Sequence, residues 1–233
     1  MIQAAWTFEG LQSIGFTYGI APLLKQVYPD PRERAKVVGK YLDFFNSHPY
    51  MSTAILGATA SLELAEKREN RGTPEQLKNT VSGPLAAIGD ALFWTGLKPL
   101  FSIIAVIASF LGYMAGPLIF LVLFNAFHIW MRIVGFIQGL HHGFGLVRFV
   151  DALKLPELTR FIKQVTTILL GVFSACFLFF LPNISTLSIP PLFRMLAVCP
   201  FFCVYLLIKR RVPVLVQIYV YSVAVLAFFL LWG

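Results

Sequence analysis

Residues 99–131 read PLFSIIAVIASFLGYMAGPLIFLVLFNAFHIWM, and this stretch decides the fold class of the chain. Its 33 residues include no Lys, Arg, Asp or Glu. As one straight helix they would be about 50 Å long, whereas the hydrocarbon core of a bilayer is about 30 Å thick. Gly116-Pro117 lies in the middle and favours a helix break. We therefore expect a membrane-embedded hairpin or a discontinuous helix.

The composition of the whole chain also indicates lipid. Of 233 residues, 58% are hydrophobic and 13% charged, whereas about 25% are charged in a soluble domain. Nine of the eleven acidic residues lie at or before Asp90. The net charge is +8, but the basic residues flank apolar segments without the aromatic interleaving of a nucleic-acid site. We predict an all-α integral membrane protein that contacts the lipid bilayer and no nucleic acid.

Residues 1–80 are predicted to form amphipathic helices at the membrane interface. Apolar side chains recur there at helical spacing, first at Trp6, Phe8, Leu11, Ile14 and Tyr18 and then at Val37, Val38, Leu42 and Phe45. A third helix is expected from about Tyr50, and Gly72-Thr73-Pro74 follows its charged end.

Three further regions are predicted beyond these helices. Residues 81–147 form a membrane-embedded region of broken helices or a hairpin, in which Gly83-Pro84 offers a second break. Residues 148–163 form a basic cytoplasmic loop. Residues 164–233 form C-terminal transmembrane helices, with apolar segments at 164–181, 192–208 and 212–232.

Basic residues orient these segments through the positive-inside rule. The loop 148–163 and Lys209-Arg210-Arg211 are basic, whereas the connection 182–191 has no charge. This pattern places the N-terminal region in the cytoplasm and the C-terminus outside. The pattern allows about five to seven membrane-embedded segments, and the number of crossings between residues 80 and 147 stays open.

Asp90 is a candidate functional carboxylate. It has few polar neighbours in sequence, and a carboxylate at membrane depth is costly unless it is paired or faces water. A structural role is equally open, either as an interfacial helix cap or in an ion pair with Lys98 or Arg132.

Asn46-Ser47-His48-Pro49-Tyr50 joins two predicted helices and holds two further candidates, Asn46 and His48. Amide and imidazole groups can hydrogen-bond sugar hydroxyls, and an aromatic face can pack on the C–H face of a sugar. On composition alone, a helix cap is the simpler interpretation of this segment.

Asn125, His128 and Arg132 follow one another at helical spacing on an otherwise apolar helix. This polar stripe, which Gly135, Gly139 and His142 roughly continue, can line a cavity. Interhelical hydrogen bonding is the alternative, and we favour it for Asn125 and His128.

The sequence offers no self-contained catalytic or metal site. His141 and His142 are adjacent, so on a helix they point about 100° apart, and no acid or cysteine completes a ligand set. Neither a phosphate-binding loop nor a readable Ser-His-Asp set is present. We expect no metal, no cofactor and no catalysis by the chain alone.

Several stretches together resemble one family over essentially the whole chain. They are Trp6-Thr7-Phe8-Glu9, Ala21-Pro22-Leu23-Leu24-Lys25, Phe44-Phe45-Asn46-Ser47-His48-Pro49-Tyr50, residues 83–94 (GPLAAIGDALFW) and Gly116-Pro117-Leu118 with Leu123-Phe124-Asn125. This set is similar to the IID membrane subunit of the mannose/fructose/sorbose-family sugar phosphotransferase systems.

The resemblance implies a multi-pass permease subunit of the bacterial inner membrane that forms a hetero-oligomer, with homo-oligomerisation also expected. It would pair with a IIC membrane subunit and work with the cytoplasmic IIA and IIB phosphocarriers. Phosphorylated IIB would donate phosphate to an incoming hexose or amino sugar. The IID subunit of this family is not itself phosphorylated, so no histidine here is expected to carry phosphate.

The resemblance also marks Asn46, His48 and Asp90 as motif positions, and we take them as candidates for sugar binding. The alternative function is a transport-inactive membrane scaffold or regulator that keeps the same fold.

Overall fold

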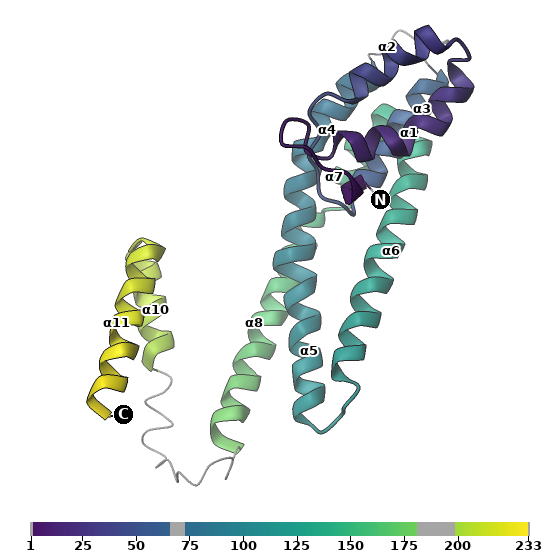
Figure 1. The fold of residues 1–233 in the computed structure, drawn as a ribbon. Helices are drawn as coiled ribbons and strands as arrows, with labels where there is room; N and C mark the ends of the chain where they lie inside the picture. Colours follow the sequence, from purple (N-terminus) through teal and green to yellow (C-terminus); the bar gives the residue numbers. More distant parts are fainter. Residues whose placement is uncertain (1, 66–72, 181–198, 233) are drawn as a thin grey trace. The chain divides into compact units, whose positions relative to one another are not determined.

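The computed structural model describes residues 2–65, 73–180 and 199–232. The regular elements in these ranges are all helices. In order they are η1 (Ile2–Ala4), α1 (Ser13–Val27), α2 (Pro31–Tyr41), α3 (Ser52–Ala65), α4 (Pro74–Gly89), η2 (Asp90–Leu97), α5 (Lys98–Phe110), α6 (Gly116–His142), η3 (Gly143–Gly145), α7 (Leu146–Ala152), α8 (Leu155–Phe180), α10 (Cys199–Lys209) and α11 (Val214–Trp232) (Figure 1). Two compact units, Met1–Gly171 and Val172–Gly233, divide the chain, and each is described by itself.

The first unit begins with an irregular segment rather than a helix. Backbone hydrogen bonds join Thr7 to Leu11 in both directions, and Leu11 has a positive φ of 49°. The predicted helical pattern over residues 6–11 is therefore wrong. Its aromatic members have no core to cover, since Trp6 is 57% and Phe8 100% exposed. The segment instead pairs with residue 45, where the amide of Phe45 donates to Gly10 and the amide of Gln12 donates to Phe45.

Local sequence signals explain the short helices α1 to α3. Asp30 caps α2 by accepting a hydrogen bond from the Arg32 amide, and Pro31 occupies the first turn. The helix ends at Tyr41, so Phe45 lies beyond it and not on its apolar face as predicted. α3 ends by Ala65, and after residues 66–72 Thr73 begins α4 with a capping box to Gln76.

One long helical stretch follows from α4 through η2 to α5. The helix continues through Pro84, so the predicted break at Gly83-Pro84 is wrong. The irregularity lies further on, in η2, which is a π-helix over eight residues. A π-helical insertion inside an α-helix is uncommon and is frequent at functional sites.

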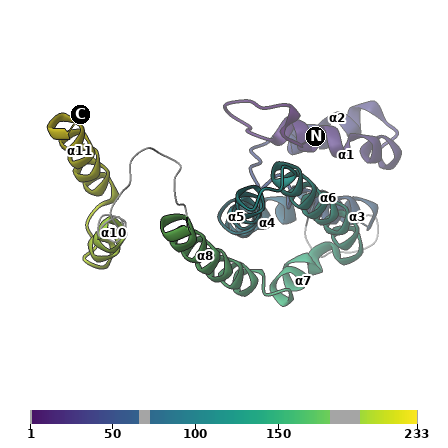
Figure 2. The ribbon, with the colours of Figure 1, turned by 90° about the horizontal axis from the view of Figure 1, so that it is seen from below.

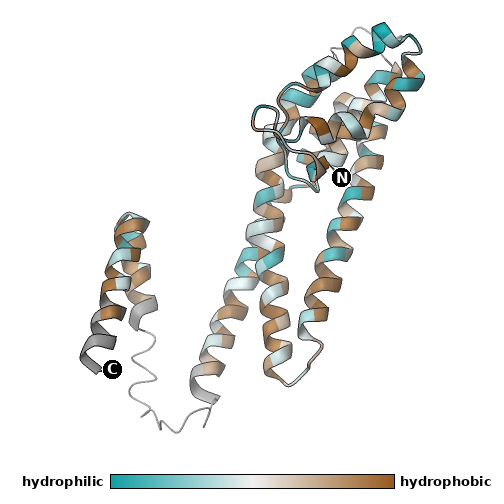
Figure 3. Ribbon diagram, viewed as in Figure 1, coloured by the Kyte–Doolittle hydropathy of each residue, from teal (hydrophilic) through white to brown (hydrophobic). Residues whose placement is uncertain are grey.

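α5 and α6 form an antiparallel hairpin that contains the apolar stretch of residues 99–131 (Figures 1 and 2). The turn uses Gly112 at φ +90°, and Pro117 occupies the first turn of α6. Of the two predicted forms, the hairpin is present. α6 has 27 residues, so it is about 40 Å long, enough to cross a hydrocarbon core of about 30 Å. Figure 3 shows α5 and the adjoining part of α6 as predominantly hydrophobic.

Close packing of α3 on α6 fixes the core of the first unit, and Figures 1 and 2 both show these helices side by side. A Cβ atom on Gly57 would overlap the carbonyl oxygen of Phe136, and one on Gly139 would overlap that of Ala54. Small residues on both helices therefore let the two backbones approach closely.

In the C-terminal part, the described helices overlap in residue range with the predicted membrane segments. α8 covers most of the predicted segment 164–181, α11 that at 212–232, and α10 the end of that at 192–208. The connection 182–191 lies outside the described residues. In the second unit α10 contacts α11. Among described residues, two helical stretches, Pro74–Phe110 and Gly116–Phe177, are long and apolar enough to cross a membrane.

Candidate functional site

His48 lies buried at the turn that precedes α3. The preceding residue is held on both sides, because the Gln12 side chain bonds the backbone of Ser47 and the Ser47 hydroxyl donates to the Ser82 carbonyl at 3.0 Å. His48 packs directly on Gly89 of α4, where any side chain would overlap the imidazole. His48 is therefore held in place by Gln12, which precedes α1, and by Ser82 and Gly89 of α4.

Aromatic rings connect this histidine to the polar stripe on α6. His48 stacks on Phe93 with ring centroids 4.9 Å apart, and Tyr50 lies 4.7 Å from Phe93. Tyr50 in turn stacks on His128 at 4.5 Å, and the guanidinium carbon of Arg132 lies 4.9 Å from the Tyr50 ring. We call this group the His48–Arg132 cluster; its members are His48, Tyr50, Phe93, Trp94, Phe124, His128 and Arg132.

Three buried nitrogen atoms of the cluster have no hydrogen-bond partner within the described residues. They are His48 Nε2, His128 Nδ1 and Arg132 Nε. His48 Nδ1 accepts from the Tyr50 amide at 3.3 Å, so its Nε2 carries the proton and is a donor. His128 Nε2 lies 2.9 Å from Asn125 Oδ1, which leaves His128 Nδ1 as an acceptor. The cluster thus offers two unused donors and one unused acceptor, a pattern that native cores seldom leave unsatisfied.

The charge state of the cluster follows from its burial. Burial, and after it the nearby Arg132 charge, lowers the pKa of His48 from 6.5 to about 4. His48 is therefore neutral near pH 7. The positive charge of the cluster resides on Arg132, which the face of the Tyr50 ring partly offsets.

The other sequence candidates lie around the cluster rather than in it. Asn46 and Asp90 are both exposed. Asp90 is the C-cap residue of α4 and the first residue of η2, and no ion pair joins it to Lys98 or Arg132 in the described part of the chain. The ion-pair interpretation of Asp90 is therefore wrong. Lys98 instead lies over the Trp94 ring at 5.3 Å.

Asn125 belongs to the polar stripe and joins the cluster through His128. Its side-chain amide donates to Leu121 O at 2.7 Å, so the hydrogen bonds of Asn125 and His128 lie within α6 and not between helices as favoured from the sequence. Tyr50, Phe93 and Trp94 were not predicted from the sequence as site residues. All three lie inside the motifs that carried His48 and Asp90, so the motifs held the signal.

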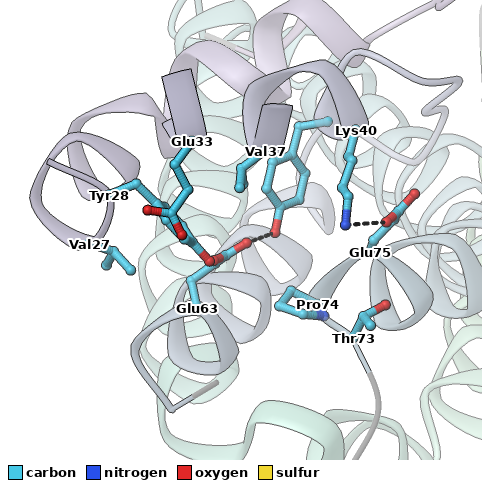
Figure 4. Close-up of a pocket in the computed structure, with 10 residues that line it drawn as sticks. Val27, Tyr28, Glu33, Val37, Lys40, Glu63, Thr73, Pro74 and Glu75 are labelled. Atoms are coloured by element: carbon cyan, nitrogen blue, oxygen red, sulfur yellow. Dashed lines mark hydrogen bonds and ion pairs between the residues drawn. The ribbon is translucent and has the colours of Figure 1, made fainter. Parts of the chain in front are cut away.

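A pocket of about 310 Å³ lies among α1, α2, α3 and the start of α4 and contains the carboxylate of Glu63 (Figure 4). Glu63 is 3% exposed and accepts hydrogen bonds from the hydroxyls of Tyr28 and Tyr41. Lys40 and Glu75 pair beside it at 3.9 Å. These contacts tie α2 to α3 and α4. No group of three metal-ligating side chains is arranged for a metal ion in the described residues.

Comparison with known proteins places this chain in one family. The family model for the "PTS system mannose/fructose/sorbose family IID component" matches residues 1–232. The mannose-specific EIID component of Escherichia coli (strain K12) is 33% identical over 166 residues, which cover 69% of this chain and 58% of that protein. The chain thus aligns to less than two thirds of that relative. The sorbose-specific EIID component of Lacticaseibacillus casei is 25% identical over 98% of this chain and 88% of its own length.

Solved structures confirm the helical membrane fold. One described as "Structure of membrane protein" has a TM-score of 0.69 and 25% identity, covering 98% of this chain and 92% of that chain. A chain of the complex of the mannose transporter ManYZ with microcin E492 has a TM-score of 0.57 and 24% identity, and shows the fold alone. The predicted all-α integral membrane fold is confirmed, and the chain belongs to the IID component family of the mannose/fructose/sorbose phosphotransferase systems.

Proposed function

We propose that this chain is a IID permease subunit that acts with a IIC subunit to translocate a hexose or amino sugar. A phosphorylated IIB subunit, charged by IIA, would phosphorylate the sugar on the cytoplasmic side. The family match over residues 1–232 supports the subunit assignment. The matched relatives bear the names of mannose-specific and sorbose-specific components, which supports a sugar as the substrate.

The His48–Arg132 cluster is the observation that carries the proposal for sugar binding. A sugar hydroxyl both donates and accepts, and the cluster holds two buried donors without a partner, His48 Nε2 and Arg132 Nε, and one such acceptor, His128 Nδ1. Trp94, whose ring centroid lies 5.9 Å from that of Tyr50, offers the aromatic surface on which the C–H face of a sugar can pack. Trp94 is partly exposed, so this surface opens outward from the subunit.

Asn46 and Asp90 remain proposed contributors at the edge of this site. Asn46 lies two residues before His48, and Asp90 follows Gly89, on which His48 packs. Each can hold the side chains of the cluster in position, or can hydrogen-bond a sugar hydroxyl that points out of the site. Because both are exposed, a IIC subunit docked over the cluster would desolvate them together with the sugar.

The segment 148–163, predicted as a loop, is instead helical, because it belongs to α7 and the start of α8. The proposed topology places the helices of residues 1–80 and this basic segment on the cytoplasmic side and the C-terminus outside. The α5–α6 hairpin supports an even number of crossings between these two regions, since α6 runs antiparallel to α5 and brings the chain back to the side from which it came. This chain would then speed phosphate transfer by positioning the sugar, and not by covalent chemistry of its own.

The test is co-purification of the full chain with its IIC and IIB partners, followed by phosphate transfer from phosphorylated IIB to candidate hexoses and amino sugars. Transfer that requires the chain, and that falls at least tenfold with His48→Asn at equal complex yield, supports the proposal. A stable complex without transfer to any sugar supports the scaffold function instead. Normal transfer by His48→Asn and Arg132→Gln would remove the cluster from the site.

A further inference from the structure

Lys78 of α4 is fully buried, although its side chain carries a charge. Its exposed fraction is 0%, and its Nζ atom lies 5.9 Å from the ring centroids of both Tyr41 and Phe45. The ammonium donates a hydrogen bond to the backbone carbonyl of Asp43, with the two atoms 3.4 Å apart. In the described part of the chain, its partners are thus one loop carbonyl and two aromatic faces.

A buried ammonium is an unfavourable choice if its only task is to fill space. Taking a charge out of water weakens folding, and an apolar side chain of similar volume often replaces a buried ion without loss of stability. An apolar side chain at position 78 would pack on the same two rings. What the ammonium adds is a hydrogen-bond donor for the Asp43 carbonyl.

Asp43 begins an irregular segment that ends in His48. These residues lie between α2 and α3 and belong to no helix. Irregular backbone depends on hydrogen-bond partners from neighbouring elements. The middle of the segment, at Phe45 and Ser47, is held by hydrogen bonds to the chain that precedes α1. Lys78 supplies the partner at its first residue.

One face of α4 contacts this segment from its beginning to its end. Lys78 holds the first residue, and Gly89 packs on His48, the last. Between them, the Ser82 carbonyl accepts a hydrogen bond from a serine hydroxyl of the segment at 3.0 Å. Positions 78, 82 and 89 recur at helical spacing, so a single helix face meets both ends of the segment.

We propose that Lys78 is a positioning residue for His48. Its ammonium fixes the start of the segment, and the imidazole at the end of the segment thereby stays within the His48–Arg132 cluster. Lys78 is not a member of the cluster, so it acts through the segment and not on the sugar. The consequence for sugar binding rests on the function proposed above, because a displaced donor binds a sugar hydroxyl less well.

The first measurement follows His48 itself and needs no sugar. Diethyl pyrocarbonate acylates neutral imidazoles that solvent reaches, and mass spectrometry locates the label in membranes that contain the full chain. His48 is 2% exposed and should react slowly, with the exposed His141 as internal reference. Lys78→Met removes the donor and should speed the labelling of His48 about tenfold. Lys78→Arg keeps a donor and should label as slowly as wild type. Lys36→Met, at an exposed position of α2, is the matched control.

The second measurement compares phosphate transfer with stability in the same variants, in complex with the IIC and IIB partners. Lys78→Met should raise the KM for sugar about tenfold and change kcat by less than about twofold. Its melting temperature should stay within about 3 °C of wild type, because an apolar side chain replaces the buried cation. Where Lys78→Met does not accumulate, Lys78→Gln takes its place, since it stays polar but removes the ammonium.

Unchanged labelling of His48 in Lys78→Met overturns the proposal. Melting temperatures that fall equally in Lys78→Met and Lys78→Arg overturn it too, because Lys78 would then serve stability alone. An unchanged KM in Lys78→Met, where His48→Asn is defective, also overturns it. Faster labelling with normal transfer, where His48→Asn transfers normally as well, supports positioning by Lys78 and removes His48 from the sugar site instead.

Discussion

The imidazole of His128 stacks on the ring of Tyr50 with centroids 4.5 Å apart and planes 12° apart. Tyr50 belongs to the turn before α3, and His128 lies in the middle of α6. This contact joins a motif near the N-terminus to the polar stripe of a membrane helix. The Arg132 guanidinium on the same Tyr50 ring makes that residue the centre of the cluster.

Tyr50 is therefore expected to act through its ring and not its hydroxyl. Tyr50→Phe keeps the faces on which His128 and Arg132 pack, so we expect sugar phosphorylation within about twofold of wild type. Tyr50→Ala removes both contacts, each worth about 1 kcal/mol, and should lower the rate of transfer at least tenfold. Rates are measured with phosphorylated IIB at equal amounts of complex. Equal defects in the two variants would point to the hydroxyl.

The buried His48 gives the protein a defined pH dependence. Its pKa is lowered to about 4 by burial first and by Arg132 second, whereas the unfolded chain has a pKa near 6.5. The unfolded state therefore binds a proton first as the pH falls, so stability is retained above pH 6.5 and is lost towards pH 4. At pH 5 the loss is about 2 kcal/mol, or roughly 5 °C in the melting temperature.

His48→Asn isolates this contribution, because Asn keeps an acceptor for the Tyr50 amide but does not titrate. Melting temperatures in detergent are compared at pH 7.5 and pH 5.0. The drop should be smaller in His48→Asn than in wild type by roughly 5 °C. Parallel drops in both proteins would show that other groups, such as carboxylates, account for the acid sensitivity.

The close approach of α3 and α6 predicts a severe effect of one added methyl group. Gly139→Ala and Gly57→Ala each place a Cβ atom against a carbonyl oxygen of the facing helix. Because backbone cannot move aside as a side chain can, each change should cost about 1–3 kcal/mol or more. Gly171→Ala is the matched control, since nothing lies within 4 Å of its added methyl. Thermal unfolding in detergent measures all three, and an unchanged Gly139→Ala would mean that the helices separate readily.

Hydropathy and charge placement could predict the class of the fold but not its N-terminal segment. The hairpin was predictable because residues 99–131 exceed the length of one span and contain Gly116-Pro117. Residues 6–11 were misread because their spacing alone fits a helix, whereas backbone pairing with Phe45 decides their path. Pro84 was misread for a related reason, since surrounding contacts keep α4 continuous through a residue that weakens isolated helices.

The site was predictable only in part, because sequence motifs do not specify orientation. His48, His128 and Arg132 meet in the cluster, whereas Asn46 and Asp90 from the same motifs are exposed. The meeting depends on the α3–α6 contact between residues far apart in sequence. Helical spacing could place the stripe on one face of α6, but not identify Tyr50 as its neighbour.

The buried Glu63 predicts that its tyrosine partners stabilise the N-terminal helices. Tyr41→Phe removes a hydrogen bond to a buried carboxylate and should cost about 1.5–3 kcal/mol. Tyr18→Phe makes the same chemical change at a side chain that is 72% exposed, and should be nearly neutral. Limited proteolysis reports the opening of α2, and Tyr41→Phe should be cleaved faster. Equal cleavage of the two variants would contradict a tie between α2 and α3.

The α5–α6 turn gives the sharpest test of topology. Met114 is 95% exposed at the tip of the hairpin, and α6 is about 40 Å long, so the tip should reach the outer surface. In a chain whose Cys176, Cys199 and Cys203 are replaced by serine, Met114→Cys should react with an impermeant maleimide on intact cells. Lys36→Cys, on the exposed side of α2, should react only after the membrane is opened. Protection of Met114→Cys from both sides would instead mean that the hairpin enters the bilayer and returns without crossing it.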